Sequence, residues 1–143
     1  MRLVEEKRDL FDVSEDYYLA HCISADFALG AGIAKEFNKR YNMRTELNSI
    51  YVTSSIKDNL GKALLVGRTF NLVTKERYWH KPTYASLRTT LVDMRMQVLS
   101  MQIKKLAMPL IGCGLDKLQW EKVKTLIKEI FSDDDLEIIV CRK

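Results

Sequence analysis

The sequence has 143 residues, of which 47% are hydrophobic and 29% charged, and its formal net charge is +4 at pH 7. This length suits a single domain with its own hydrophobic core, and the mild, dispersed positive charge does not predict a dedicated nucleic-acid binder. No apolar run approaches the ~20 residues that span a membrane, and residues 1–6 lack the apolar segment of a signal peptide, so we expect a cytoplasmic protein without membrane association.

The first half of the chain predicts four strands and one helix. The strands are expected over residues 2–7, 18–23, 62–69 and 70–75. The helix is expected over residues 30–41, because Ile33, Phe37 and Tyr41 recur at the spacing that places them on one helical face.

The second half predicts two helices and two strands. Thr83 follows Pro82 and is the expected N-cap of an amphipathic helix. Apolar residues then recur every three or four positions, at Leu87, Leu91, Met94, Val98 and Met101. A last helix shows the same spacing at Trp120, Val123, Ile127 and Ile130. Strands are predicted over residues 106–111 and 136–140.

This alternation predicts an α/β domain with helices on both faces of a mixed, mostly parallel sheet. Ligands in such folds bind beyond the carboxyl ends of the strands. Residues 24–33 and 111–116 form glycine-rich turns there, each between a predicted strand and a predicted helix. Glycines let backbone N–H groups approach an anion, and a helix N-terminus adds partial positive charge. A diphosphate held between the two turns is one interpretation, and purely conformational glycines are the other.

Other nucleotide-binding motifs are not present in the sequence. Gly30 and Gly32 begin a dinucleotide-binding G-x-G-x-x-G pattern, but Lys35 stands where its third glycine should be. No G-x-x-x-x-G-K-[ST] sequence occurs, which excludes a P-loop.

The cysteines and histidines favour neither a disulfide framework nor a metal site. Three cysteines make an odd number, no two of them have C-x-x-C spacing, and the two histidines lie far apart. These residues are Cys22, Cys113, Cys141, His21 and His80. We expect no metal and no other cofactor.

Several polar residues also have a simple local interpretation. Asp116 lies three residues before Gln119 and could cap the last helix, Lys75 could be a solvated lysine at a strand end, and Asp9 could be a turn aspartate. Trp79 lies in a polar segment, and the sequence leaves open whether it shields a pocket or packs on the surface.

Six segments together resemble the macrodomains and, within them, the terminal ADP-ribose protein glycohydrolase branch. They occur in the family's order at residues 8–11, 20–26, 30–34, 72–75, 80–84 and 108–120. The most specific of them is Ile-Gly-Cys-Gly-Leu-Asp at residues 111–116, followed by Leu-Gln-Trp at residues 118–120. The resemblance implies that residues 1–143 form a single three-layer α/β/α macrodomain.

The resemblance also implies roles for individual residues. Asp9 would accept a hydrogen bond from the adenine amino group, the two glycine-rich loops would hold the diphosphate and the distal ribose, and Lys75 and Asp116 would be catalytic. The implied contacts with ADP-ribose are Asp9, Leu10, His21, Ser24, Gly30, Ala31, Gly32, Ile33, Ile111, Gly112, Cys113, Gly114 and Leu115.

The implied activity is hydrolysis that removes mono-ADP-ribose from acidic (Glu or Asp) side chains through a lysine nucleophile, together with deacylation of O-acyl-ADP-ribose. Two alternatives remain open: a reader that binds ADP-ribose without cleaving it, and a hydrolase of ADP-ribose 1″-phosphate or of ADP-ribosylated nucleic acid. The expected partners are ADP-ribose and mono-ADP-ribosylated protein, with nucleic acid only as an ADP-ribosylated substrate, and the chain is expected to be a monomer.

The expected chemistry requires a neutral amine. An uncharged Lys75 can attack the anomeric carbon of the distal ribose and form a Schiff base, while a carboxylate takes up and returns protons. Lysine is normally charged at neutral pH, so burial or cationic neighbours must favour the neutral form. Arg77, Lys81 and Lys117 lie close in sequence to the two catalytic candidates and could contribute.

Overall fold

A computed structural model of all 143 residues contains one six-stranded sheet, with the strands in the order β1-β6-β5-β2-β4-β3. The strands are β1 (Arg2–Lys7), β2 (Tyr18–Ser24), β3 (Ala63–Val66), β4 (Thr69–Lys75), β5 (Lys105–Met108) and β6 (Glu137–Arg142). The helices are α1 (Gly32–Tyr41), α2 (Met43–Ile50), α3 (Tyr84–Ser100) and α4 (Trp120–Phe131), with short 3₁₀ turns at Leu10–Asp12 and Ile56–Asn59.

Five of the strands are parallel. β1 pairs with β6, β6 with β5, β5 with β2, and β2 with β4, all in parallel register, whereas β3 pairs with β4 in antiparallel register at the edge. The predicted mixed, mostly parallel sheet is confirmed. Because the five parallel strands run in one direction, their carboxyl ends meet at one edge of the sheet, where ligands of such folds bind.

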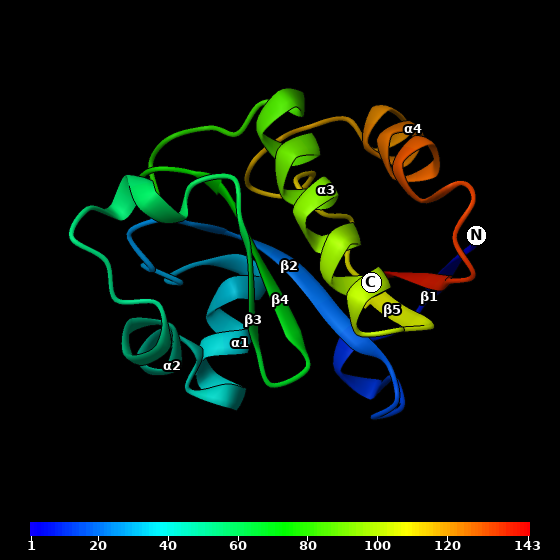
Figure 1. Cartoon of the computed structure of the whole chain (residues 1–143), viewed down its shortest axis with the longest axis horizontal. Coiled ribbons are helices and arrows are strands. Elements are labelled where there is room, and N and C mark those ends of the chain that lie inside the picture. The colour runs from blue at the N-terminus through cyan, green and yellow to red at the C-terminus, as the bar shows by residue number, and fades with distance from the viewer.

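Helices cover both faces of the sheet. On β6, Ile138 and Val140 belong to the core that includes the buried side chains of α3 and α4, whereas Ile139 and Cys141 belong to the core that includes those of α1 and α2. This alternation follows from the two-residue period of a strand. Figure 1 shows α3 and α4 side by side on one side of the sheet and α1 with α2 on the other. None of the helices is long and apolar enough to cross a membrane.

Several predicted elements have boundaries that differ from the structure. The helix expected from residue 30 begins at Gly32, so Gly30 and Ala31 remain in the loop before it. The strand expected over residues 106–111 ends at Met108, which lengthens the second glycine-rich loop. The strand expected over residues 62–69 ends at Val66, and β4 already begins at Thr69. The two strands form a hairpin with its turn at residues 67–68.

The helix α2 was not predicted. Asn42 adopts a left-handed conformation with φ 53°, which ends α1 and lets a new helix begin one residue later. Met43 and Leu47, one helical turn apart, are buried in the same core as α1. With Ile50 they have helical spacing, but eight residues form too short a segment for this pattern to stand out from its polar neighbours.

The predicted start of α3 is confirmed. The Thr83 hydroxyl accepts a hydrogen bond from the backbone of Ser86, and the Ser86 hydroxyl accepts one from the backbone of Thr83, which completes a capping box. This cap fixes where the segment that follows Lys75 enters the helix.

Candidate active site

A cavity of about 1010 Å³ lies at the carboxyl ends of the parallel strands. Its volume is at the upper end of the ~300–1,000 Å³ of small-molecule sites, which suits an elongated ligand. Both glycine-rich loops line it, together with residues just after β1 and at the ends of β4 and β6. The topology therefore brings together segments that are more than 100 positions apart in the sequence.

The first glycine-rich loop joins β2 to α1. The pairing of β2 with β4 shifts register at its end, so that Ser24 stands opposite Lys75 beside the cavity. Ala31 is the N-cap of α1 and provides no side-chain cap, so the backbone N–H groups of the first turn remain available to an anion. Phe27 and Leu29 have positive φ values of 53° and 44°, and burial of both side chains holds this unfavourable backbone in place.

The second glycine-rich loop joins β5 to α4. Gly112 has φ 72°, and a Cβ at this position would lie 2.9 Å from Leu118 Cδ1, so only glycine fits without rearrangement. Across the cavity, a Cβ at Gly32 would lie 3.3 Å from Leu115 Cδ1, which shows how closely the two loops approach. The expectation that Asp116 begins the last helix is wrong, because α4 starts at Trp120.

Lys75 and Asp116 meet between these loops. Lys75 Nζ lies 2.6 Å from Asp116 Oδ1, and the two side chains are only 14% and 15% exposed. The local interpretations of both residues are therefore wrong: Lys75 is not a solvated lysine, and Asp116 does not cap α4, whose N-cap is Gln119. An amine and a carboxylate that are mostly shielded from solvent and in contact can exchange a proton directly.

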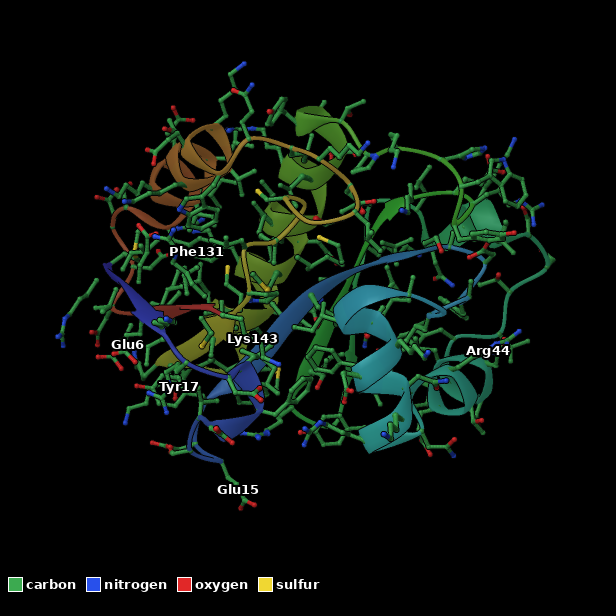
Figure 2. The ribbon with its side chains drawn as sticks, turned by 180° about the vertical axis from the view of Figure 1, so that it is seen from behind. Glu6, Glu15, Tyr17, Arg44, Phe131 and Lys143 are labelled. Carbon is green, nitrogen blue, oxygen red and sulfur yellow. The ribbon has the colours of Figure 1, made fainter.

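Asp9 lies at another part of the cavity, beside the C-terminal end of β6. One carboxylate oxygen accepts a hydrogen bond from the backbone of Phe11 at 3.0 Å, so the turn role considered for Asp9 is present. The other oxygen lies 3.7 Å from Lys143 Nζ, which Figure 2 labels near the middle of the rear view. That second oxygen retains its capacity to accept a hydrogen bond from a ligand.

Two relatives match nearly the whole chain. The ADP-ribose glycohydrolase OARD1 proteins of Homo sapiens and Bos taurus are each 40% identical to it over 143 aligned positions, which cover 97% of this chain and 90% of each relative. No protein-family model matches the sequence.

This chain belongs to the OARD1 family of macrodomains. Solved structures agree with the fold. The macrodomain of Mycobacterium tuberculosis DarG superposes with a TM-score of 0.84 at 22% identity, covering 97% of this chain and 96% of that one. Thermosipho africanus DarTG in complex with ADP-ribose superposes with a TM-score of 0.79 at 16% identity, covering 99% of this chain and 42% of that one.

One expected contact residue of this macrodomain does not reach the cavity. His21 is wholly buried, its Nε2 lies 2.6 Å from Asn71 Oδ1, and its ring stacks on Phe37 with centroids 3.9 Å apart. Cys22, Ile23 and Ser24, which follow His21 toward the carboxyl end of β2, line the cavity, whereas His21 lies one step deeper along the strand. Burial lowers the pKa of His21 to about 4, so the imidazole is neutral at physiological pH. The other twelve expected contacts, with Lys75 and Asp116, all line the cavity.

The thiols of the macrodomain site are poorly suited to be nucleophiles. Burial raises the pKa of Cys113 to about 11, and burial together with the charge of Asp116 raises the pKa of Cys22 to about 12. Both thiols therefore stay protonated at neutral pH, whereas the thiolate is the reactive form.

Sequence reasoning missed the residues that join the loops of this macrodomain. Asp26 accepts hydrogen bonds from the backbone of Ala28 at 3.2 Å and of Tyr78 at 3.0 Å, and so ties the first loop to the segment after β4. Lys81 Nζ donates to the Leu115 carbonyl at 2.9 Å and ties the same segment to the second loop. The bond from Ala28 to Asp26 is an Asx turn, which was a readable sequence signal, but the contact with Tyr78 crosses 52 positions.

Proposed function

We propose that residues 1–143 act as one macrodomain that binds ADP-ribose and hydrolyses the ester between ADP-ribose and an acidic side chain, with Lys75 as nucleophile. The observation that carries the proposal is the contact of 2.6 Å between Lys75 Nζ and Asp116 Oδ1 inside a cavity bounded by two glycine-rich loops. The name of the two relatives, ADP-ribose glycohydrolase OARD1, supports the hydrolytic reaction.

In the proposed complex the diphosphate lies between the two loops. The uncapped first turn of α1 and the backbone around Gly112 supply N–H groups. Asp9 accepts a hydrogen bond from the adenine amino group with Oδ2, the oxygen that Phe11 does not use. The distal ribose then extends toward Lys75 and Asp116, which places its anomeric carbon C1″ next to the amine.

The reaction begins with transfer of a proton from Lys75 to Asp116. The neutral amine attacks C1″, and the bond from C1″ to the acyl oxygen breaks with its electron pair, so the acidic side chain leaves as a carboxylate. A carboxylate is a good leaving group and needs little protonation. The nitrogen loses a proton to solvent, and the ribose ring opens as its oxygen takes the proton held by Asp116. This gives a protonated Schiff base at C1″ and restores the Asp116 carboxylate. Water adds to this carbon with Asp116 as base, the C–N bond breaks, and ADP-ribose and Lys75 are released.

The same site suits O-acyl-ADP-ribose as a second substrate class, because it also carries an ester on the distal ribose. A reader without catalysis is a weaker proposal, since binding alone gives no reason to enclose an amine and a carboxylate in contact.

A direct comparison of substrates tests the proposal. The protein is incubated with Glu-linked, Ser-linked and nucleic-acid-linked ADP-ribose, and the released ADP-ribose is measured. We expect release from the Glu-linked substrate, because its carboxylate leaves without an added proton, whereas a serine oxygen does not. Release from the Ser-linked or nucleic-acid-linked substrate alone would reject the proposed acceptor, and release from none would reject the hydrolase.

A further inference from the structure

Two exposed aromatic side chains lie at the edge of the cavity. Tyr78 lines the cavity, whereas its neighbour Trp79 lies outside, and they are 63% and 62% exposed. The two rings are edge to face with centroids 5.0 Å apart. Tryptophan and tyrosine are enriched at binding hot spots, because they bury a large area with few rotatable bonds. The reaction proposed above does not use either ring.

The backbone that carries the pair is held firmly. The Tyr78 amide donates to Asp26, the His80 amide donates to the Arg77 carbonyl at 3.0 Å, and the Arg77 amide donates to His80 Nδ1 at 3.3 Å. Lys81 anchors the end of the segment to the second loop. The aromatic rings therefore point outward from an ordered turn, and a partner would find them already arranged, which lowers the entropy cost of binding.

The pair lies close to the reaction centre along the chain. Tyr78 follows Lys75 by three residues, a stretch of chain that spans at most ~11 Å. A group attached to C1″ next to Lys75 must pass out of the cavity, and Tyr78 is the lining residue that continues outward to Trp79.

The surroundings of the pair carry unneutralised positive charge. Arg77, Lys81 and Lys117 are exposed, and none of them forms an ion pair. The nearby carboxylates of Glu76 and Asp116 are each paired with a lysine, at 3.9 and 2.6 Å. Asp26, which accepts from the Tyr78 amide, forms no ion pair and offsets one of the three positive charges. An acidic partner would therefore be attracted to this rim.

We propose that Tyr78 and Trp79 form an acceptor subsite, which packs against the polypeptide flanking the ADP-ribosylated Glu or Asp. Arg77, Lys81 and Lys117 favour acidic flanking residues. The inference rests on the proposed function, in which the cleaved ester joins ADP-ribose to a polypeptide. The subsite determines which substrates are hydrolysed quickly and takes no part in the chemistry.

Two substrates with the same ester bond test the subsite. One is a peptide with an ADP-ribosylated glutamate flanked by acidic residues, and the other is free ADP-ribosylated glutamate. We expect Trp79→Ala to lower kcat/KM for the peptide by about 10-fold, and the Tyr78→Ala/Trp79→Ala protein to lower it further. Trp79→Ala should leave kcat/KM for free ADP-ribosylated glutamate and the affinity for ADP-ribose unchanged. Met96→Ala, which removes an apolar side chain 65% exposed on α3, is the matched control.

The outcomes separate the subsite from the proposed function. If the unmodified protein hydrolyses neither substrate, the proposed function fails. If it hydrolyses both, and Trp79→Ala lowers both rates equally or neither, the subsite is rejected. A loss confined to an ADP-ribosylated oligonucleotide, measured in parallel, would show that the rings stack on bases and would overturn the polypeptide assignment.

Binding without turnover gives an independent readout. In a Lys75→Ala background, the ADP-ribosylated peptide should shift tryptophan emission to shorter wavelength, because it covers the Trp79 ring, while ADP-ribose alone should not. The shift should disappear in Lys75→Ala/Trp79→Phe, in which Trp120 is the remaining tryptophan. An identical shift in the two proteins would rule out contact with Trp79.

Reversal of charge tests the preference for acidic flanks. Arg77→Glu should lower kcat/KM for the acidic peptide and raise it for a peptide with basic flanks, and both effects should shrink at high ionic strength. Equal changes for the two peptides would show that the rim does not select by charge.

Discussion

Lys75 Nζ and Asp116 Oδ1 lie 2.6 Å apart although 41 positions separate them in the sequence. Lys75 is the last residue of β4, and Asp116 lies in the loop after β5, so the contact depends on two parallel strands of the sheet ending at the same edge. The carboxylate both holds the ammonium in place and is the nearest base to which it can give a proton. The proposed roles therefore differ, with Lys75 as nucleophile and Asp116 as base, and substitution of each residue can test them separately.

Removal of the Lys75 amine should stop the reaction while binding persists. Lys75→Ala should lower the release of ADP-ribose from a Glu-linked substrate by about 10³-fold or more, as expected for loss of a nucleophile. Lys75→Arg is the sharper control, because it keeps the positive charge but supplies no neutral amine. Near-normal turnover in Lys75→Arg would mean that the lysine acts only electrostatically. Affinity for ADP-ribose, measured by calorimetry, should change little in either variant.

Removal of the Asp116 carboxylate should expose the covalent intermediate. Without a base to activate water, Asp116→Ala given substrate should accumulate an adduct with the mass of ADP-ribose on Lys75. Borohydride should trap its imine form, and peptide mass spectrometry should locate it. The Lys75→Arg/Asp116→Ala protein serves as control and should carry none. An adduct on another residue would assign the nucleophile elsewhere.

Loss of the Asp9 carboxylate should weaken ADP-ribose binding. Asp9→Ala should reduce the binding free energy by about 1.5–3 kcal/mol, the range for hydrogen bonds that involve a charged group. Because Asp9 also accepts a hydrogen bond from Phe11, Asp9→Asn is the structural control: its oxygen can keep that bond, while its NH₂ group then faces the adenine amino group. Titrations in EDTA should give the same affinities as titrations without it. Unchanged affinity in a folded Asp9→Ala protein would show that the adenine role is wrongly assigned.

The thiol beside the catalytic pair should be dispensable. Cys113→Ser should keep most of the turnover, because burial raises the pKa of this thiol to about 11 and leaves almost no thiolate at neutral pH. Steady-state kinetics on the Glu-linked substrate measure this directly. Complete loss of turnover with ADP-ribose binding intact would revive a thiol mechanism.

The buried imidazole should make stability depend on pH. The pKa of His21 falls from its usual 6.5 to about 4 in the folded protein, so the unfolded chain binds more protons between these values. The stabilisation is fully present above about pH 6.5 and is lost as pH falls toward 4, by about 3 kcal/mol in all. Protonation of His21 in the folded protein is unfavourable because the added proton would sit on Nδ1, which is buried without a hydrogen-bond partner.

Denaturant unfolding between pH 7 and pH 4 measures this contribution. Carboxylates titrate in the same range, so the comparison is with His21→Gln, which can keep a hydrogen bond to Asn71 but does not titrate. The variant should be less stable than the parent at pH 7 and should lose less stability on acidification. If the free energy of unfolding falls equally in the two proteins between pH 7 and pH 4, His21 does not cause the loss of stability in acid.

The regular elements could be predicted from sequence because their signals are local. Apolar residues at a period of 3.6 predicted α3 and α4, and Thr83 predicted where α3 begins. The same reasoning missed α2, because Met43, Leu47 and Ile50 give only two turns of helical spacing in a segment of eight residues. The sequence also placed the two glycine-rich loops at strand ends, although it set the end of β5 too late.

The site was predictable in its residue types but not in its geometry. The glycine-rich loops were readable from the sequence itself, whereas the resemblance to macrodomains supplied Asp9, Lys75, Asp116 and His21 as candidates. Only the tertiary structure decided that His21 is enclosed in the core, since Ile23 shares its face of β2 but lies nearer the carboxyl end of the strand, where the cavity is. It also decided that Asp116 meets Lys75 instead of capping α4, and that Asp26 reaches Tyr78. These contacts join distant strands and loops, and the order of strands in the sheet, which no local pattern encodes, brings them together.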